Sequence, residues 1–66
     1  MPNKEDKNYF ENFNILVVDD ILENIKVIGN MLREKGAKVT PAINGEQALK
    51  LANVKGYDLI LLDISI

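Results

Sequence analysis

Two runs of apolar residues, each ending in aspartate, constrain the fold of this chain more than any other feature. Residues 59–62 (LILL) are followed by Asp63, and residues 15–18 (ILVV) are followed by Asp19 and Asp20. An unbroken apolar run of this length is typical of a strand buried on both faces, as in a parallel sheet covered by helices. Open α/β sheets place their chemistry at the carboxyl ends of the strands. The sequence therefore predicts a parallel sheet with acidic side chains at one rim.

The segments between these runs alternate between helix and strand patterns. Apolar residues at three- and four-residue spacing predict a helix over about 21–35, which Gly36 ends. A short strand over 37–42 contains Pro41, which has no N–H to donate and therefore favours a sheet edge. Asn44 and Gly45 signal a turn before a second helix over about 46–55. With strands expected over 14–18 and 58–62, the predicted order is βαβαβ.

This order predicts which strands are neighbours. Both crossovers should be right-handed, and the long apolar first strand should be central, giving the strand order 2-1-3. Asp19, Asp20 and Asp63 then lie at adjacent strand ends, where three carboxylates repel one another unless a cation binds. Mg²⁺ prefers oxygen ligands and is typically held by one or two carboxylates with water and phosphate oxygens. We therefore predict a Mg²⁺ site at which the carboxylate of Asp63 attacks phosphorus to form an acyl phosphate.

Simpler explanations exist for each acid taken alone. Asp20 fits the N-cap of the first helix, Asp63 fits a turn that closes a strand, and Asp58 fits a loop without a catalytic role. Other phosphate sites have little support, because the chain has neither a G-x-x-x-x-G-K-[ST] loop nor a G-x-G-x-x-G motif. Phosphatases of the haloacid dehalogenase type need a second acid two positions after the nucleophile, and that position is Ser65.

Composition excludes several classes of function. The net charge is −2, with lysines and acids interspersed, so neither nucleic acid nor an acidic membrane surface is an expected partner. The chain has no cysteine and no histidine, which excludes disulfides and thiolate or imidazole metal ligands and fits a cytoplasmic location. No apolar run reaches membrane length. Residues 1–13 read as a polar leader before a domain over 14–66. The leader's aromatic residues fit a loosely ordered arm, packing against a helix or a partner contact: Tyr9, Phe10 and Phe13.

Three motifs together resemble the receiver domain of two-component response regulators, which has a flavodoxin-like fold. They are residues 15–20 (ILVVDD), 44–49 (NGEQAL) and 57–63 (YDLILLD), and the resemblance runs from Asn14 to the last residue. It implies that Asp19 and Asp20 bind Mg²⁺ and that the backbone carbonyl of Ser65 is a further metal ligand. It also implies that Asp63 accepts a phosphoryl group from a sensor histidine kinase or phosphotransfer domain, as an acceptor module rather than an enzyme. Residues 22–24 (LEN) resemble receivers of hybrid kinases.

The sequence departs from the family pattern in length. Receivers have five strands and five helices, whereas this sequence stops after the third strand, without the Ser/Thr and Lys of a complete receiver. We therefore expect about half a receiver, either a fragment or a piece completed by another chain, in which phosphorylation is absent or poor.

The alternative is a non-catalytic interaction or structural module. We expect a homo-oligomer or a complementing chain at the exposed third strand and residues 64–66. The contact is either antiparallel pairing of two third strands or face-to-face packing of two half-sheets.

Overall fold

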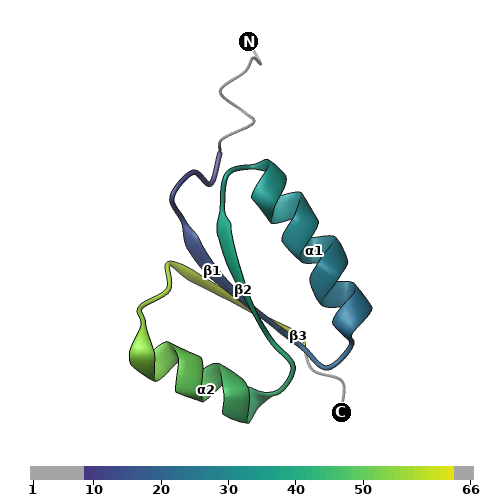
Figure 1. The fold of residues 1–66 in the computed structure, drawn as a ribbon, viewed down its shortest axis with the longest axis vertical. Coiled ribbons are helices and arrows are strands. Elements are labelled where there is room, and N and C mark those ends of the chain that lie inside the picture. Colours follow the sequence, from purple (N-terminus) through teal and green to yellow (C-terminus); the bar gives the residue numbers. More distant parts are fainter. Residues whose placement is uncertain (1–8, 64–66) are drawn as a thin grey trace.

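A three-stranded parallel sheet with one helix on each face forms the core of the molecule (Figure 1). The computed structural model describes residues 9–63. The elements follow in the order β1 (Asn14–Asp19), α1 (Leu22–Glu34), β2 (Lys38–Ala42), α2 (Gly45–Val54) and β3 (Leu59–Asp63). The strand order is β2-β1-β3, so the predicted βαβαβ half of a doubly wound sheet is confirmed.

Strand β1 is central because it pairs in parallel with both other strands. Residues 15–19 of β1 are all buried, since neighbouring strands cover both edges and helices cover both faces. Strand β2 lies at an edge, as Pro41 predicted, and pairs with β1 from Asn14 opposite Lys38 to Val18 opposite Ala42.

Alternating residues of β1 enter two separate apolar cores. Ile15 and Val17 face α1, where they pack with Ile25 and Ala37. Leu16 and Val18 face α2, where they pack with Ala42 and with the partly buried Ala48, Leu51 and Tyr57. The predicted apolar stripe of α1 is only partly in the core: Ile25 is buried, whereas Ile21, Leu22 and Met31 are about half exposed or more.

The segment just before β1 is docked on the α1 side of the sheet. The Phe10 N–H donates to the carbonyl of Lys35 (2.8 Å), and the Phe13 carbonyl accepts from the N–H of Lys38 (2.8 Å). The ring of Phe10 packs against the core cluster beneath α1, and it meets the rings of Tyr9 and Phe13 at centroid distances of 5.2 and 5.6 Å. Of the three alternatives considered for these aromatic residues, packing against a helix is the one that describes Phe10.

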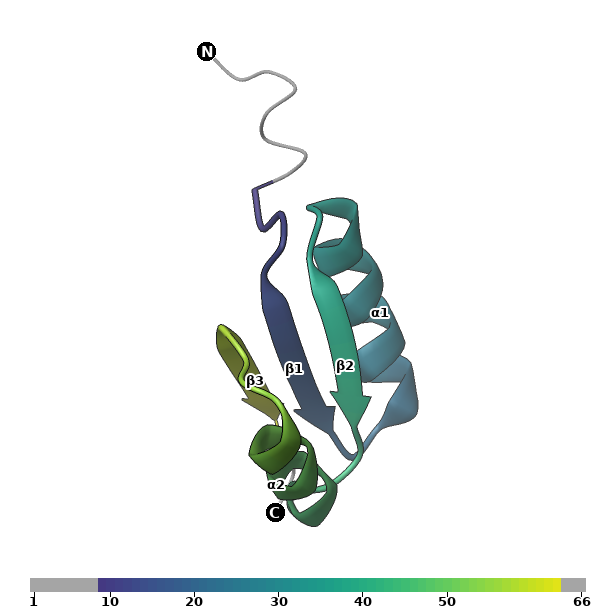
Figure 2. The same cartoon turned by 60° about the vertical axis from the view of Figure 1, so that its left-hand side comes forward.

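Strand β3 is more exposed than its apolar sequence indicates. We expected its run to suit burial on both faces, yet only Leu61 is half-buried, and Ile60 and Leu62 are 49% and 66% exposed. The cause is visible in Figure 2, where β3 forms one edge of the sheet and neither helix lies beside its free edge. The expectation of an apolar edge at the third strand is consistent with this arrangement.

Candidate functional site

The carboxyl ends of β1 and β3 are neighbours because the two strands run parallel and in register. Asp19 is the last residue of β1 and pairs directly with Asp63, the last residue of β3. Both strands end one residue later than predicted, so these aspartates lie within the sheet rather than after it. The three strands point toward the same edge of the sheet in Figure 1, the edge at which open α/β sheets place their functional groups.

Asp19 is a buried carboxylate with a partner on each oxygen. The residue is 1% exposed. Its Oδ1 accepts the backbone N–H of Ile21 at 2.9 Å, and its Oδ2 accepts the side-chain amide of Asn24 at 3.3 Å. A buried carboxylate is costly without such donors. Asp19 is therefore held in one orientation by groups of the loop and the first turn of α1.

Asp20 is exposed and does not cap α1. The N-cap position is Ile21, and no side chain makes a capping hydrogen bond at this helix end. The N-cap explanation for Asp20 is therefore wrong. Within residues 9–63, no hydrogen bond joins the Asp20 carboxylate to another residue, which leaves both of its oxygens open to solvent.

Asp63 is also exposed, at the end of β3. Ser65, whose carbonyl the family resemblance assigns to the metal, lies outside the described residues. Asp58 has a different role at the opposite end of β3. Its Oδ2 accepts the N–H of Asn14 at 2.8 Å while its own N–H donates to the Asn14 carbonyl at 2.8 Å, which joins the starts of β1 and β3.

The described residues do not present an assembled three-carboxylate site. Within 9–63, no group of three or more acidic side chains lies close enough to hold a metal ion. The assignment of Asp19, Asp20 and Asp63 as ligands stays a prediction. The donors nevertheless fit Mg²⁺ chemically, because Asp20 and Asp63 offer exposed carboxylate oxygens and Mg²⁺ commonly takes one or two carboxylates and fills its other positions with water.

Asn24 is the residue of this region that sequence reasoning assigned no role. It is the third residue of α1 and donates the only side-chain hydrogen bond to Asp19 among the described residues. The available signal was its position in the first helical turn, five residues after the carboxylate, where a side chain can reach back toward the strand end.

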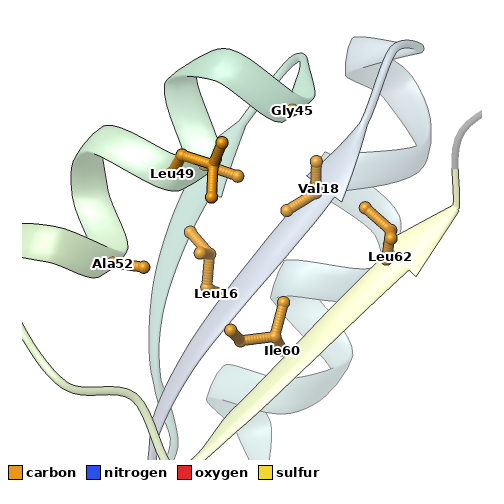
Figure 3. A pocket seen from close by; sticks show the side chains of 8 residues that line it. Leu16, Val18, Gly45, Leu49, Ala52, Ile60 and Leu62 are labelled. Atoms are coloured by element: carbon orange, nitrogen blue, oxygen red, sulfur yellow. The ribbon is translucent and has the colours of Figure 1, made fainter.

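A hollow on the α2 face of the sheet is almost entirely apolar. It has a volume of about 300 Å³. In Figure 3 side chains from β1, β3 and α2 point into it. Its lining comes from Leu16, Val18, Gly45, Ala48, Leu49, Ala52, Ile60 and Leu62. It carries no acidic group, so it is separate from the rim of aspartates.

Comparison with known protein families identifies the family to which this chain is similar. The family model described as "Response regulator receiver domain" matches residues 15–66. The chain belongs to the response regulator receiver domain family. The matched range includes the ends of both strands that carry the aspartates and the helix α1, which contains Asn24.

Curated relatives of this receiver chain are regulators and histidine kinases. It is 43% identical over 54 residues to "Transcriptional regulatory protein ZraR" of Klebsiella oxytoca, covering 82% of this chain and 12% of the relative. It is 37% identical over 60 residues to "Probable transcriptional regulator ycf27" of Cyanidium caldarium, covering 91% of this chain and 24% of the relative. It is 46% identical over 52 residues to "Probable histidine kinase 4" of Oryza sativa subsp. japonica, covering 77% of this chain and 5% of the relative.

The receiver chain spans less than a quarter of the length of these relatives. No solved structure matches it significantly. Neither helix within residues 9–63 has both the length and the hydrophobicity needed to cross a bilayer.

Proposed function

We propose that this receiver chain is the phosphoacceptor part of a two-component phosphorelay and that Asp63 receives the phosphoryl group. The observation that carries the proposal is the direct register of Asp63 with Asp19 at the carboxyl edge of the sheet. Asp63 is exposed there and thus accessible to a donor, whereas Asp19 is buried and already hydrogen-bonded. The three acids therefore have different roles.

The reaction needs one nucleophilic oxygen and a way to offset negative charge. An oxygen of Asp63 forms a bond to phosphorus as the bond from phosphorus to the donor atom breaks, and the electron pair leaves with the donor. The product is an acyl phosphate. Bound Mg²⁺ supplies neutralisation of charge on the transferred group. Asp20 and Asp63 would hold the ion, together with the Ser65 carbonyl, and Asp19 would act directly or through water.

The partners follow from the family. The donor is a phosphohistidine of a sensor histidine kinase or of a phosphotransfer domain, and the relay is cytoplasmic. Relatives whose names include histidine kinases support this choice. The 66 residues do not include the Ser/Thr and Lys that later strands supply in complete receivers, so we expect this chain, tested alone, to accept phosphate slowly.

Intact-mass spectrometry after incubation with acetyl phosphate and Mg²⁺ tests the proposal. The wild-type chain should gain one phosphoryl group slowly, and this gain should disappear in Asp63→Asn and on chelation of Mg²⁺. Asp58→Asn is the matched control, because Asp58 lies at the other end of the same strand and should leave labelling unchanged. Labelling that persists in Asp63→Asn would contradict the assignment. Fast, complete labelling would show instead that the later strands are dispensable.

The exposed β3 supports a second candidate, an interaction module that self-associates through this strand. Ile60 and Leu62 line the apolar hollow, and Leu59 is 39% exposed. An apolar edge strand with an open side is a template for pairing. A homo-oligomer or a complementing chain at β3 would cover both the edge and the hollow.

Sedimentation equilibrium at micromolar concentration tests the second candidate. Wild type should sediment as a dimer or larger species, and Leu62→Lys should dissociate it while the fold persists, because Leu62 is 66% exposed. Leu61→Lys should dissociate and unfold the chain together, since Leu61 packs against the core beneath α1. Val54→Lys, at an 85% exposed position outside the lining of the hollow, is the control and should change neither property. A folded wild-type monomer contradicts this candidate.

A further inference from the structure

We propose that Asn24 is a positioning residue for the acidic rim, fixing the carboxylate of Asp19 through its side-chain amide. The inference rests on the proposed function, because the rim matters only if it binds a cation and a phosphoryl group. Asn24 touches neither ligand in this role and acts through Asp19 alone.

The geometry of Asp19 shows why a second donor is needed. Its backbone is fixed at the end of β1, in register with Asp63. The Ile21 N–H holds Oδ1 at 2.9 Å, but one hydrogen bond leaves the carboxylate free to turn about the Cβ–Cγ bond. The Asn24 amide on Oδ2, at 3.3 Å, removes that freedom. Together the two donors set the plane of a carboxylate that is 1% exposed.

The direction of the hydrogen bond separates this role from ordinary helix capping. A capping side chain accepts a hydrogen bond from a free backbone N–H of the first turn. The Asn24 side chain instead donates, and it donates to the preceding strand end rather than to the helix. Its own backbone N–H is already bound to the Ile21 carbonyl at 3.0 Å. The side chain of Asn24 therefore serves the carboxylate and not the helix terminus.

The residue type suits a site for a cation. An amide donates without adding charge, whereas a lysine at this position would compete with the cation for Asp19. An apolar side chain would leave a buried carboxylate oxygen without its donor. Groups that orient metal-site carboxylates typically contribute about 10-fold or more to metal affinity. We therefore expect about a 10-fold loss of divalent cation affinity when the Asn24 amide is removed.

The experiment has a metal-free arm and a metal arm, each with Asn24→Ala, Asn24→Gln and Asn30→Ala. Asn30 is exposed on the same helix, so its substitution reproduces the change in helix propensity away from Asp19. Without metal, the side-chain carboxyl carbon of Asp19 is observed by NMR. With metal, binding of Mn²⁺ alone is followed by electron paramagnetic resonance of the free ion.

Asn24→Ala should shift the Asp19 carboxyl resonance and weaken Mn²⁺ binding about 10-fold. Asn24→Gln, which keeps the amide, should lie closer to wild type, and Asn30→Ala should match wild type. An unchanged Asp19 resonance in Asn24→Ala overturns the inference, as does an equal loss of Mn²⁺ affinity in Asn30→Ala. If wild type binds no Mn²⁺, the proposed function fails, and the metal-free arm still decides whether Asn24 positions Asp19.

Discussion

Asp19 and Asp63 occupy directly opposed positions of two parallel strands, one side chain buried and the other exposed. Two carboxylates on paired positions repel each other. The buried member is stabilised by hydrogen bonds from this chain, and the exposed member has solvent on one side. We therefore expect the pair to weaken the isolated fold slightly and a cation held between the strand ends to reverse this effect.

Mg²⁺ should stabilise the wild-type chain through this pair. At a Mg²⁺ concentration ten times its dissociation constant, the free energy of unfolding should rise by about 1.4 kcal/mol, because the proposed site would form only in the folded state. Asp63→Asn should start a few tenths of a kcal/mol more stable without Mg²⁺, at roughly the scale of cross-strand charge pairs, and gain little on adding it. Urea denaturation with and without Mg²⁺ measures both effects. Asp58→Asn should keep the full gain, and an equal gain in Asp63→Asn would place the ion elsewhere.

Phe10→Ala should destabilise the fold. The Phe10 ring packs against the core beneath α1 but is only partly buried, so we expect about 2 kcal/mol, below the cost of truncating a fully buried phenylalanine. Tyr9→Ala is the control, because Tyr9 is 72% exposed and should cost roughly 0.5 kcal/mol or less. Thermal or urea unfolding by circular dichroism gives both values. Equal effects at the two positions would mean that the docked segment contributes nothing specific.

Gly36→Ala should also destabilise, for a backbone reason. Gly36 has φ +95°, and an added Cβ would lie 3.0 Å from the Glu11 Cα. Strain of this kind costs about 1–3 kcal/mol. At Gly56 an added Cβ meets nothing within 4 Å, so Gly56→Ala should be neutral or stabilise by about 0.5 kcal/mol. The unfolding midpoint should fall in Gly36→Ala and stay level or rise in Gly56→Ala, and a neutral Gly36→Ala would refute the close approach of residue 11.

Asn44→Ala should weaken the start of α2. Asn44 Oδ1 accepts the N–H of Gln47 at 2.8 Å, while Gln47 Oε1 accepts the N–H of Ile43 at 2.8 Å, so the two side chains cap reciprocally. Loss of the cap should cost about 1 kcal/mol. Asn53→Ala, at an exposed position inside the same helix, should be neutral or slightly stabilising. Amide exchange in the first turn of α2 should rise only in Asn44→Ala.

Features set by local sequence were predictable. The apolar run of residues 15–18 identified a central strand, Pro41 an edge strand, and Gly36 a helix end in the left-handed region. The neighbouring positions of Asp19 and Asp63 were also predictable. Each follows an apolar run that marks a strand, and right-handed parallel crossovers bring the ends of these two strands together.

Contacts between segments that are far apart in the sequence were not predicted. Phe10 is partly buried, with its N–H bonded to the Lys35 carbonyl, and Asp58 binds the backbone of Asn14. Neither contact has a signal in the spacing of residues. Asn24 was missed because its partner, Asp19, lies beyond the helix in which periodicity was read. The exposed edge of β3 was expected from the topology, whereas the exposure of its faces was not, because its apolar run alone indicates burial on both faces.

The central position of β1 has a consequence for how the chain acquires its structure during synthesis. Strand β1 leaves the ribosome before both of its neighbouring strands, and the contact between Asn14 and Asp58 spans 44 positions in the chain. Pairings of such long range form slowly, because the intervening loop must close before any contact rewards it. Until residue 63 has emerged, the apolar run of residues 15–18 has one unpaired edge, and exposed apolar strand edges of this kind are prone to aggregation. The strand that carries Asp63 is thus the last to join the sheet, and the strand that carries Asp19 is exposed until it does.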